Sequence, residues 1–395
     1  MTEQAKVPAI RFAGFTDPWE QRKLGELFEE SDERASDREI LSVSVANGIY
    51  PASESDRETN PGASLANYKI VHFGDVVYNS MRMWQGAVDA SRYDGIVSPA
   101  YVVARPNSEV YARFFARLLR QPMLLKQYQQ VSQGNSKDTQ VLKFDDFASI
   151  GISMPASENE QRRIGGFFDR LDSLITLHQR KYDKLVILKK SMLEKMFPKD
   201  GESVPEIRFA GFTDPWEQRE LVDIAEIVGG GTPDTNNSNY WDGDIDWYAP
   251  AELGNNIYAE SSTRKITQAG FDSCSTKMLP ADKTILFTSR AGIGNTAILR
   301  HSACTNQGFQ SLVIGDADVY FVYSMSERIK KWAEEKASGS TFLEISGRQL
   351  ETMPVNLPSL VEQQAIGSFF SHLDDLITLH QRKRLSIRQR SPVWS

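Results

Sequence analysis

The chain of 395 residues has few of the side chains that bind metals or form disulfides. Its two cysteines, Cys274 and Cys304, belong to no CxxC motif and have no pair of histidines nearby, so we expect neither a disulfide nor a metal site. The sequence also has no run of about 18 apolar residues, and its start, MTEQAKVPAI, lacks the apolar segment of a signal peptide. We therefore expect a cytoplasmic protein.

Catalytic motifs are missing as well. There is no GxxxxGK[ST] phosphate loop, and the glycine run at 229–231 is expected to form a tight turn instead. The sequence contains no GxSxG elbow, no HExxH motif and no Asn-Pro-Pro-aromatic sequence of amino-methyltransferases. An enzyme would need a catalytic constellation that is not visible here, so catalysis by this chain alone is not expected.

The charge is unevenly distributed. A formal net charge of −7 argues against a general nucleic-acid binder, because attraction to phosphates needs clustered Lys and Arg. One stretch is nevertheless basic, with only Glu109 and Asp138 as acidic residues among its cations (Arg105, Arg113, Arg117, Arg120, Lys126, Lys137 and Lys143). This stretch could supply a local basic face on an acidic protein.

Two peptides occur twice in the chain. Residues 10–22, IRFAGFTDPWEQR, recur at 207–219, and residues 174–181, LITLHQRK, recur at 376–383. The blocks between them, about 25–154 and 223–353, share almost no sequence. A tandem duplication that keeps its framework and varies two blocks of similar size is most simply a reader of two unlike targets.

Each block is followed by apolar residues at alternating steps of four and three, the spacing of a coiled coil. Lys189 is the polar exception in the first copy. The stripes, which we expect to contact partners or the other helix, are Ile164, Phe168, Leu171, Ile175, His178, Tyr182, Leu185, Met192 and Met196, and then Ile366, Phe370, Leu373, Ile377 and His380. We expect two long antiparallel helices, with both histidines setting the register rather than acting as bases.

Both blocks have the sequence pattern of mixed α/β domains, with predicted strands followed by a predicted helix. Strands are predicted in KIVHFGDVVYNS, GAVDAS and GIVSPAYVVARP of the first block, and in KTILFTS, NTAILR and FQSLVIG of the second. A helix is predicted at 111–131 and another at 319–337. We therefore expect an α+β tandem repeat with pseudo-twofold symmetry, in which two α/β domains at 1–157 and 201–358 are separated by a central helix at 158–200 and a distal helix at 359–395.

Polar and aromatic residues gather in glycine-punctuated loops, in the same order in both blocks. Arg pairs with guanine, Asn and Gln pair with adenine, and Ser and Thr suit phosphates. Any one of these residues can equally be a solvated turn, but the matching order favours a binding role. The candidates for DNA contact are Asn79, Arg82, Trp84, Gln85, Tyr101, Asn135 and Lys137, and then Ser289, Arg290, Asn295, Asn306, Gln307, Ser340 and Thr341.

These features together resemble the specificity (S) subunit of a type I restriction-modification enzyme. The resemblance rests on ENEQRRIGGFFDRLDSLITLHQRK, VEQQAIGSFFSHLDDLITLHQRK, YWDGDIDWYAPAEL, SRAGIG, TNQGFQSLV and GSTFLEIS, and it covers nearly the whole chain. It implies a noncatalytic subunit that reads double-stranded DNA, with one domain on each half of a bipartite target. It also implies two methyltransferase subunits carrying S-adenosylmethionine, and motor-nuclease subunits using ATP and Mg.

The second copy departs from this pattern at its end, where RLSIRQRSPVWS follows Lys383. We expect the distal helix to end near Arg390 and to leave part of the central helix without a partner in the chain, at Leu185, Leu188, Met192 and Met196. Two alternatives stay open: a stand-alone DNA-binding or antirestriction protein, and a helical scaffold whose loops bind proteins.

Overall fold

The computed structural model describes residues 8–55, 65–134, 140–199, 201–290, 292–339 and 343–390. The chain divides into two compact units. Unit 1 comprises Met1–Leu177 with Lys383–Ser395, and unit 2 comprises His178–Arg382. The long helix α4, Glu158–Lys195, begins in unit 1 and ends in unit 2.

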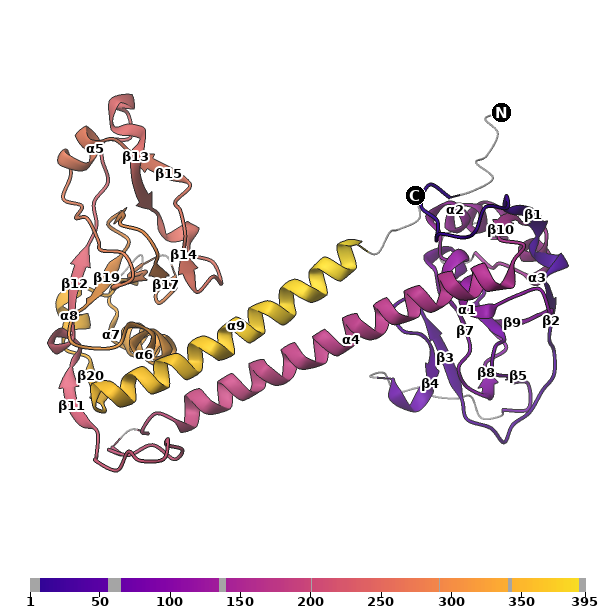
Figure 1. Cartoon of the computed structure of the whole chain (residues 1–395), viewed down its shortest axis with the longest axis horizontal. Helices are drawn as coiled ribbons and strands as arrows, with labels where there is room; N and C mark the ends of the chain where they lie inside the picture. The colour runs from indigo at the N-terminus through magenta and orange to yellow at the C-terminus, as the bar shows by residue number, and fades with distance from the viewer. Residues whose placement is uncertain are drawn as a thin grey trace. The chain divides into compact units, whose positions relative to one another are not determined.

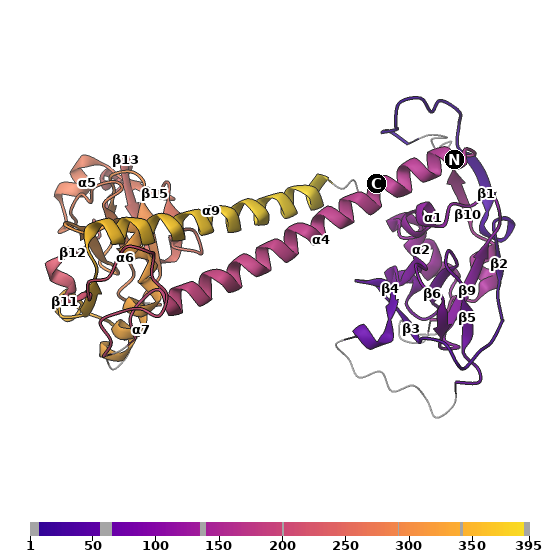
Figure 2. The same cartoon turned by 60° about the horizontal axis from the view of Figure 1, so that its bottom comes forward.

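Unit 1 is built on a four-stranded antiparallel sheet in the order β2 (Phe28–Glu30), β9 (Tyr101–Pro106), β6 (Val76–Asn79) and β7 (Val88–Ala90) (Figures 1 and 2). Two small antiparallel pairs accompany it, the hairpin of β3 (Leu41–Ser44) with β4 (Gly48–Pro51) and the pair of β5 (Lys69–Val71) with β8 (Gly95–Val97). Strand β6 is buried on both faces: Val76 and Tyr78 join the core with the helices, and Val77 joins a second core with β3. The helices are α1 (Ala112–Leu118), α2 (Pro122–Val131), α3 (Phe144–Ala148) and the first part of α4.

Unit 2 has a five-stranded sheet in the order β12 (Ala225–Gly229), β19 (Gln310–Ile314), β16 (Thr284–Phe287), β17 (Thr296–Leu299) and β14 (Tyr258–Ala259). A second sheet contains β15 (Arg264–Ile266), β13 (Trp241–Tyr248) and β18 (Cys304–Thr305). The helices are α5 (Gln268–Asp272), α6 (Val319–Ser324), α7 (Ser326–Lys336), α8 (Gly347–Glu351) and α9 (Leu360–Arg390). Helix α6 packs between the large sheet and α9 (Figure 1).

The two units share one fold despite their unlike sequences. The order β2-β9-β6-β7 in unit 1 repeats as β12-β19-β16-β17 in unit 2, and the predicted strands at these places are confirmed. The helical segments predicted after them are confirmed, except that each is divided into two helices. In unit 1 the break falls at Gln121, whose ψ of 137° is extended because Pro122 follows it. In unit 2 the break falls at Met325.

The duplicated peptide forms the same clasp in each unit. Its strand pairs with the strand before the long helix: β1 (Glu20–Lys23) with β10 (Gly151–Met154), and β11 (Glu217–Glu220) with β20 (Pro354–Leu357). Its arginine bonds a buried glutamate in the first turn of the helix, Arg11 to Glu160 and Arg208 to Glu362. Its first phenylalanine meets the helix edge-on, with Phe12 on Phe167 and Phe209 on Phe369. The duplicated peptide and the start of the long helix contact each other in both units, which explains why both segments recur in the sequence.

Within unit 2 the last part of α4 runs antiparallel to α9, as the heptad spacing predicted. The Nδ1 atoms of His178 and His380 lie 2.8 Å apart. The Nζ of Lys189 donates to both oxygens of the buried Asp374, at 2.6 and 2.8 Å, and the hydroxyl of Tyr320 donates to the same carboxylate at 2.8 Å. Lys189, the polar residue of the stripe, is therefore matched by a buried anion.

The expectation that the end of α4 would lack a partner is wrong. Met196 is 2% exposed in the core of unit 2, and Leu185 and Met192 pack against that core. Leu188 is 40% exposed, as expected. The reason is the antiparallel pairing, which sets the end of α4 against the intact beginning of α9 rather than against its divergent end. The described part of α9 runs to Arg390, and residues 391–395 lie outside the description.

Candidate nucleic-acid interface

Three polar loops of unit 2 meet at a buried serine. The backbone N–H of Ser289 donates to the carbonyl of Gly308 at 2.8 Å, and its carbonyl accepts from Ile345 at 3.0 Å. Ser338 and Glu344 exchange two backbone hydrogen bonds of 3.1 Å, which closes the third loop. The described parts of these loops are thus joined through their backbones at Ser289, Gly308 and Ile345.

Unit 1 repeats this arrangement bond for bond. Ser80 donates its N–H to the carbonyl of Ala100 at 3.2 Å and accepts from Leu142 at 2.9 Å. Gln133 and Val141 exchange two hydrogen bonds, of 3.0 and 2.9 Å, as Ser338 and Glu344 do in unit 2. The matching order of loops in the sequence therefore reflects one shared framework, on which the two units carry different side chains.

In unit 1 the predicted residues around the first loop lie at or near the surface. Arg82 is exposed, and its guanidinium lies 3.4 Å from Oε1 of Gln85. The indole of Trp84 donates to the carbonyl of Met81 at 3.1 Å, which orients the ring. Gly86 closes this turn with a φ of +90°, a value that side chains with Cβ rarely adopt.

The other two described candidates of unit 1 are half-buried. Asn79 accepts a hydrogen bond from the N–H of Met81 at 3.0 Å, so its side chain shapes the same turn. The hydroxyl of Tyr101 lies 3.4 Å from that of Ser42. Asn135 and Lys137 lie outside the described residues, as do Ser340 and Thr341 of unit 2.

In unit 2 the predicted residues divide into exposed and structural ones. Gln307 and Asn295 are exposed, and Arg290 is partly exposed. Asn306 is a turn residue, since its Oδ1 accepts from the N–H of Gly308 at 2.8 Å. The prediction that Ser289 contacts DNA is wrong for its side chain, which is fully buried at the junction of the loops.

The glycine run at 229–231 is not the expected tight turn. Gly229 ends strand β12, and a Cβ on Gly230 would overlap the carbonyl oxygens of Thr305 and Asn306. The run is therefore a close crossing of two backbones. It places Thr232 so that its hydroxyl donates to Oε1 of Gln307, which adds Thr232 to the polar loops. The glycine run was the only sequence signal for Thr232. Its structural role could not be recognised from the sequence, because it depends on the segment at Thr305 and Asn306 that crosses it.

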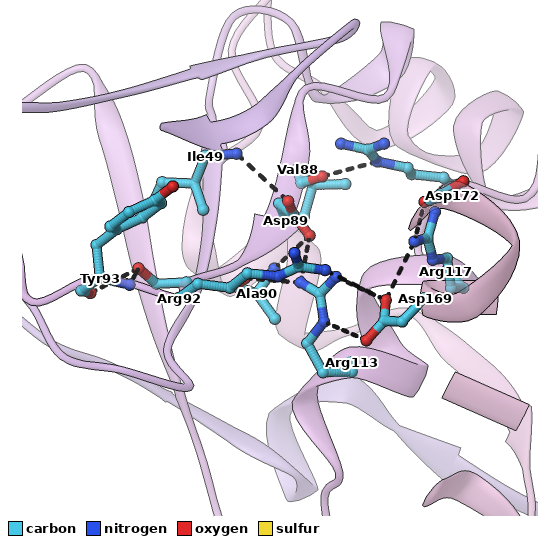
Figure 3. Close-up of polar contacts among 12 residues, drawn as sticks. Ile49, Val88, Asp89, Ala90, Arg92, Tyr93, Arg113, Arg117, Asp169 and Asp172 are labelled. Atoms are coloured by element: carbon cyan, nitrogen blue, oxygen red, sulfur yellow. Dashed lines mark hydrogen bonds and ion pairs between the residues drawn. The ribbon is translucent and has the colours of Figure 1, made fainter. Parts of the chain in front are cut away.

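Over its described residues, the basic stretch of unit 1 does not form a free basic face. Arg105 pairs with Glu33 at 2.8 Å, and Arg113 makes a two-pronged contact with Asp169 of α4 at 2.7 and 3.1 Å (Figure 3). Partial burial acts to raise the pKa of Asp169, but the hydrogen bonds and charge of Arg113 outweigh it and hold that pKa below its ordinary value. Lys126 and Lys143 are exposed. Arg105 and Arg113, in contrast, are held in ion pairs within the fold.

The predicted helix-interface residues are buried to two degrees. Fully buried in the cores of the two units are Ile164, Phe168, Ile366, Phe370 and Leu373, and half-buried are Leu171, Ile175, His178, Tyr182, Leu185, Ile377 and His380. Outside this stripe the two LITLHQRK peptides expose equivalent leucines. Leu174 and Leu376 are each 43% exposed, and Leu177 and Leu379 are 46% and 43% exposed. The repeats thus present the same apolar side chains to solvent twice.

The described part of the chain contains no group of three or more His, Cys, Asp and Glu residues that could hold a metal ion. No described helix is long and apolar enough to cross a membrane. Both cysteines, Cys274 and Cys304, are free thiols.

Comparisons with known proteins agree with this organisation. A specificity subunit of the type I restriction enzyme MjaIX from Methanocaldococcus jannaschii is 38% identical over 168 residues, which are 41% of this chain and 38% of that protein. The putative MjaX specificity subunit of the same organism is 24% identical over 346 residues, covering 82% of this chain and 77% of the relative. The chain thus matches little more than a third of the first relative's length.

Among solved structures, the type I restriction-modification S subunit from M. genitalium has a TM-score of 0.59 at 14% identity, covering 97% of this chain and 96% of that one, which supports the fold. The family model described as the type I restriction modification DNA specificity domain matches residues 16–186 and 213–389. The chain therefore belongs to the type I restriction-modification DNA specificity family and carries the family's domain twice.

Proposed function

We propose that the chain is the noncatalytic DNA-recognition subunit of a type I restriction-modification complex, in which each unit reads one half of a bipartite target. The observation that supports this most is the shared loop framework. Equivalent backbone hydrogen bonds hold the loops in both units, while their side chains at or near the surface differ, with the exposed Arg82 and the half-buried Gln85 in one and the exposed Asn295 and Gln307 in the other. A fixed frame with exchanged base-reading side chains suits two different half-sites.

The helices α4 and α9 set the gap between the half-sites and bind partner subunits in this proposal. The exposed leucine pairs Leu174 with Leu177 and Leu376 with Leu379 lie in identical peptides, so two identical methyltransferase subunits can each bind one copy. Methyl transfer with S-adenosylmethionine, and cleavage with ATP and Mg by motor-nuclease subunits, belong to those partners. Because its target is DNA, the cytoplasm remains the proposed location.

The proposal can be tested by making the two units identical. Replacing Leu24–Ile150 by Leu221–Met353 exchanges the whole first block and leaves β1 and β10 paired, since each block is closed by the same bond, from Leu24 N to Ile150 O at 3.0 Å and from Leu221 N to Met353 O at 2.9 Å. Methylation by the reconstituted complex should then occur at targets whose two halves carry the same base sequence. The reciprocal replacement is the matched control and should duplicate the other half.

Two outcomes would contradict the proposal. If either replacement altered the half-site that its unchanged unit reads, the units would not be independent readers. If the wild-type chain shifted DNA equally well and with the same specificity without a methyltransferase subunit, it would be a stand-alone DNA-binding protein. A chain that bound no DNA in either form would favour the protein-interaction scaffold.

A further inference from the structure

Unit 1 contains a cluster of arginines and aspartates where its domain meets α4 (Figure 3). Asp169 of α4 accepts from three arginines: Arg113 at 2.7 Å, Arg117 at 3.3 Å and Arg92 at 3.4 Å. Arg117 also reaches Asp172, one turn further along α4. Asp169 thus gathers cations from α1 and from the segment after β7 onto one position of the long helix.

The cluster continues from the helix into the domain. Arg113 extends its third nitrogen to Asp89 of β7 at 3.2 Å and to the carbonyl of Ala90 at 3.1 Å. Asp89 in turn accepts from the N–H of Ile49 in β4 at 3.4 Å. A Cβ on Gly48 would overlap the Asp89 carboxylate, so glycine keeps this approach open. A chain of contacts therefore runs from α4 through α1 and β7 to the β3–β4 hairpin.

The contacts of Arg113 with Asp89 and Asp169 are shielded from solvent and fixed in geometry. Side-chain exposure is 14% for Arg113, 20% for Asp89 and 26% for Asp169, so each group is largely shielded from solvent. The two-pronged Arg113–Asp169 contact fixes orientation as well as distance, unlike a single point-charge pair. Such a contact resists rotation of the domain about the helix.

Unit 2 lacks this cluster at the equivalent places. Tyr111 and Asp318 correspond, because the backbone N–H of each donates to the side chain of a helix glutamine, Gln161 or Gln363. Counting from them, and by the offset of the LITLHQRK peptides, Arg113 is replaced by Tyr320 and Asp169 by Ser371. At this place in unit 2 the hydroxyl of Tyr320 instead donates to Asp374, the counterpart of Asp172, at 2.8 Å. The same fold therefore sits on the same helix motif without the Arg113–Asp169 pair.

We propose that the Arg113–Asp169–Asp89 contact is a positioning device that fixes the orientation of the first recognition domain on α4, and thereby the gap length that the complex accepts between its half-sites. This rests on the proposed function. One base pair more or less moves a half-site by about 3.4 Å and rotates it about the DNA axis, so a domain held in one orientation rejects the wrong gap. None of the three residues needs to touch a base.

The test uses the substitution that unit 2 already contains. In complexes reconstituted with methyltransferase subunits, Asp169→Ser should lower the preference for the native gap over gaps one base pair shorter or longer by about tenfold, the scale expected when a charged, partly buried contact is lost. The bases recognised in each half should stay the same. Ser371→Ala at the equivalent place in unit 2 is the matched control and should leave the gap preference unchanged.

The double variant Arg113→Tyr with Asp169→Ser copies the side chains of unit 2 and serves if the single variant does not fold. A folded variant with the native gap preference would overturn the inference, and so would a change in the bases read by the first domain. Failure of the proposed function would look different, because the wild-type complex itself would then show no two-part target with a preferred gap.

Discussion

The buried ion pair of the second clasp offers the sharpest test of why the duplicated peptide is kept. Arg208 bonds both oxygens of Glu362 at 2.7 Å and also donates to the carbonyl of Asp214 at 2.7 Å. The glutamate side chain is only 1% exposed. Arg208→Ala therefore leaves a carboxylate buried and unpaired, which costs about 3–5 kcal/mol.

That free energy can be read as a melting temperature. In a domain of 150–250 residues each kcal/mol moves the midpoint by about 2–4 °C, so the transition of unit 2 should fall by roughly 6–20 °C. Arg219→Ala is the control within the same peptide, because Arg219 pairs with Glu217 at 2.9 Å but both side chains are about half exposed or more. Its loss should cost less than about 1 kcal/mol.

A double variant separates charge from packing. Arg208→Met with Glu362→Leu removes both charges while keeping side-chain volume, and replacement of a buried ion pair in this way is often neutral. Thermal unfolding followed by differential scanning calorimetry should show most of the lost stability restored. Equal midpoints for Arg208→Ala and Arg219→Ala would refute the reasoning, since the clasp would then not depend on its buried pair.

Two further predictions concern the recognition loops and pH. Arg82→Ala and Arg290→Ala should each weaken discrimination in one half-site only, by about 1–3 kcal/mol if a two-pronged base contact is lost, and methylation kinetics on single-base variants of the target would measure this. Unchanged discrimination in both variants would make these loops ordinary turns. Separately, hydrogen bonds from Arg105, and then His72, lower the pKa of Glu33 from 4.5 to about 2. The stabilisation from this depressed pKa is complete above about pH 4.5 and is lost as pH falls toward 2. Arg105→Gln should return the Glu33 pKa toward 4.5 in an NMR titration, and a value still near 2 would contradict the assignment.

Local patterns in the sequence predicted much of the fold correctly. The strands at 76–79, 88–90, 101–106, 284–287, 296–299 and 310–314 were visible because a strand buried on both faces leaves short apolar runs between turn residues. The antiparallel pairing in unit 2 followed from the heptad spacing. These features depend on neighbours within a few residues, so a single sequence carries them.

The candidate site was only partly predictable. The order of the polar loops was visible in the sequence, yet Ser289 proved to be buried and Thr232 was missed. Whether a loop residue faces solvent depends on which other loops cover it, and the covering segments at 305–309 and 338–345 are distant in the chain. Loop composition alone therefore identified the candidate loops but did not determine which of their side chains face solvent.

By itself the sequence determined the duplication, the matched helices, six strands of the two larger sheets and the resemblance to the family, because repeats and periodicities can be read directly from the order of residues. The order of the strands within each sheet came from the structure. Only the tertiary structure decided which charges are used and where. Arg113 and Asp169 are 56 residues apart, and Lys189 and Asp374 are 185 apart. The sequence showed a basic stretch, but the electrostatic potential at its surface depends on which acidic side chains the fold places next to the basic ones. For that reason two arginines of the basic stretch, Arg113 and Arg117, form in the structure a polar joint between the domain of unit 1 and α4.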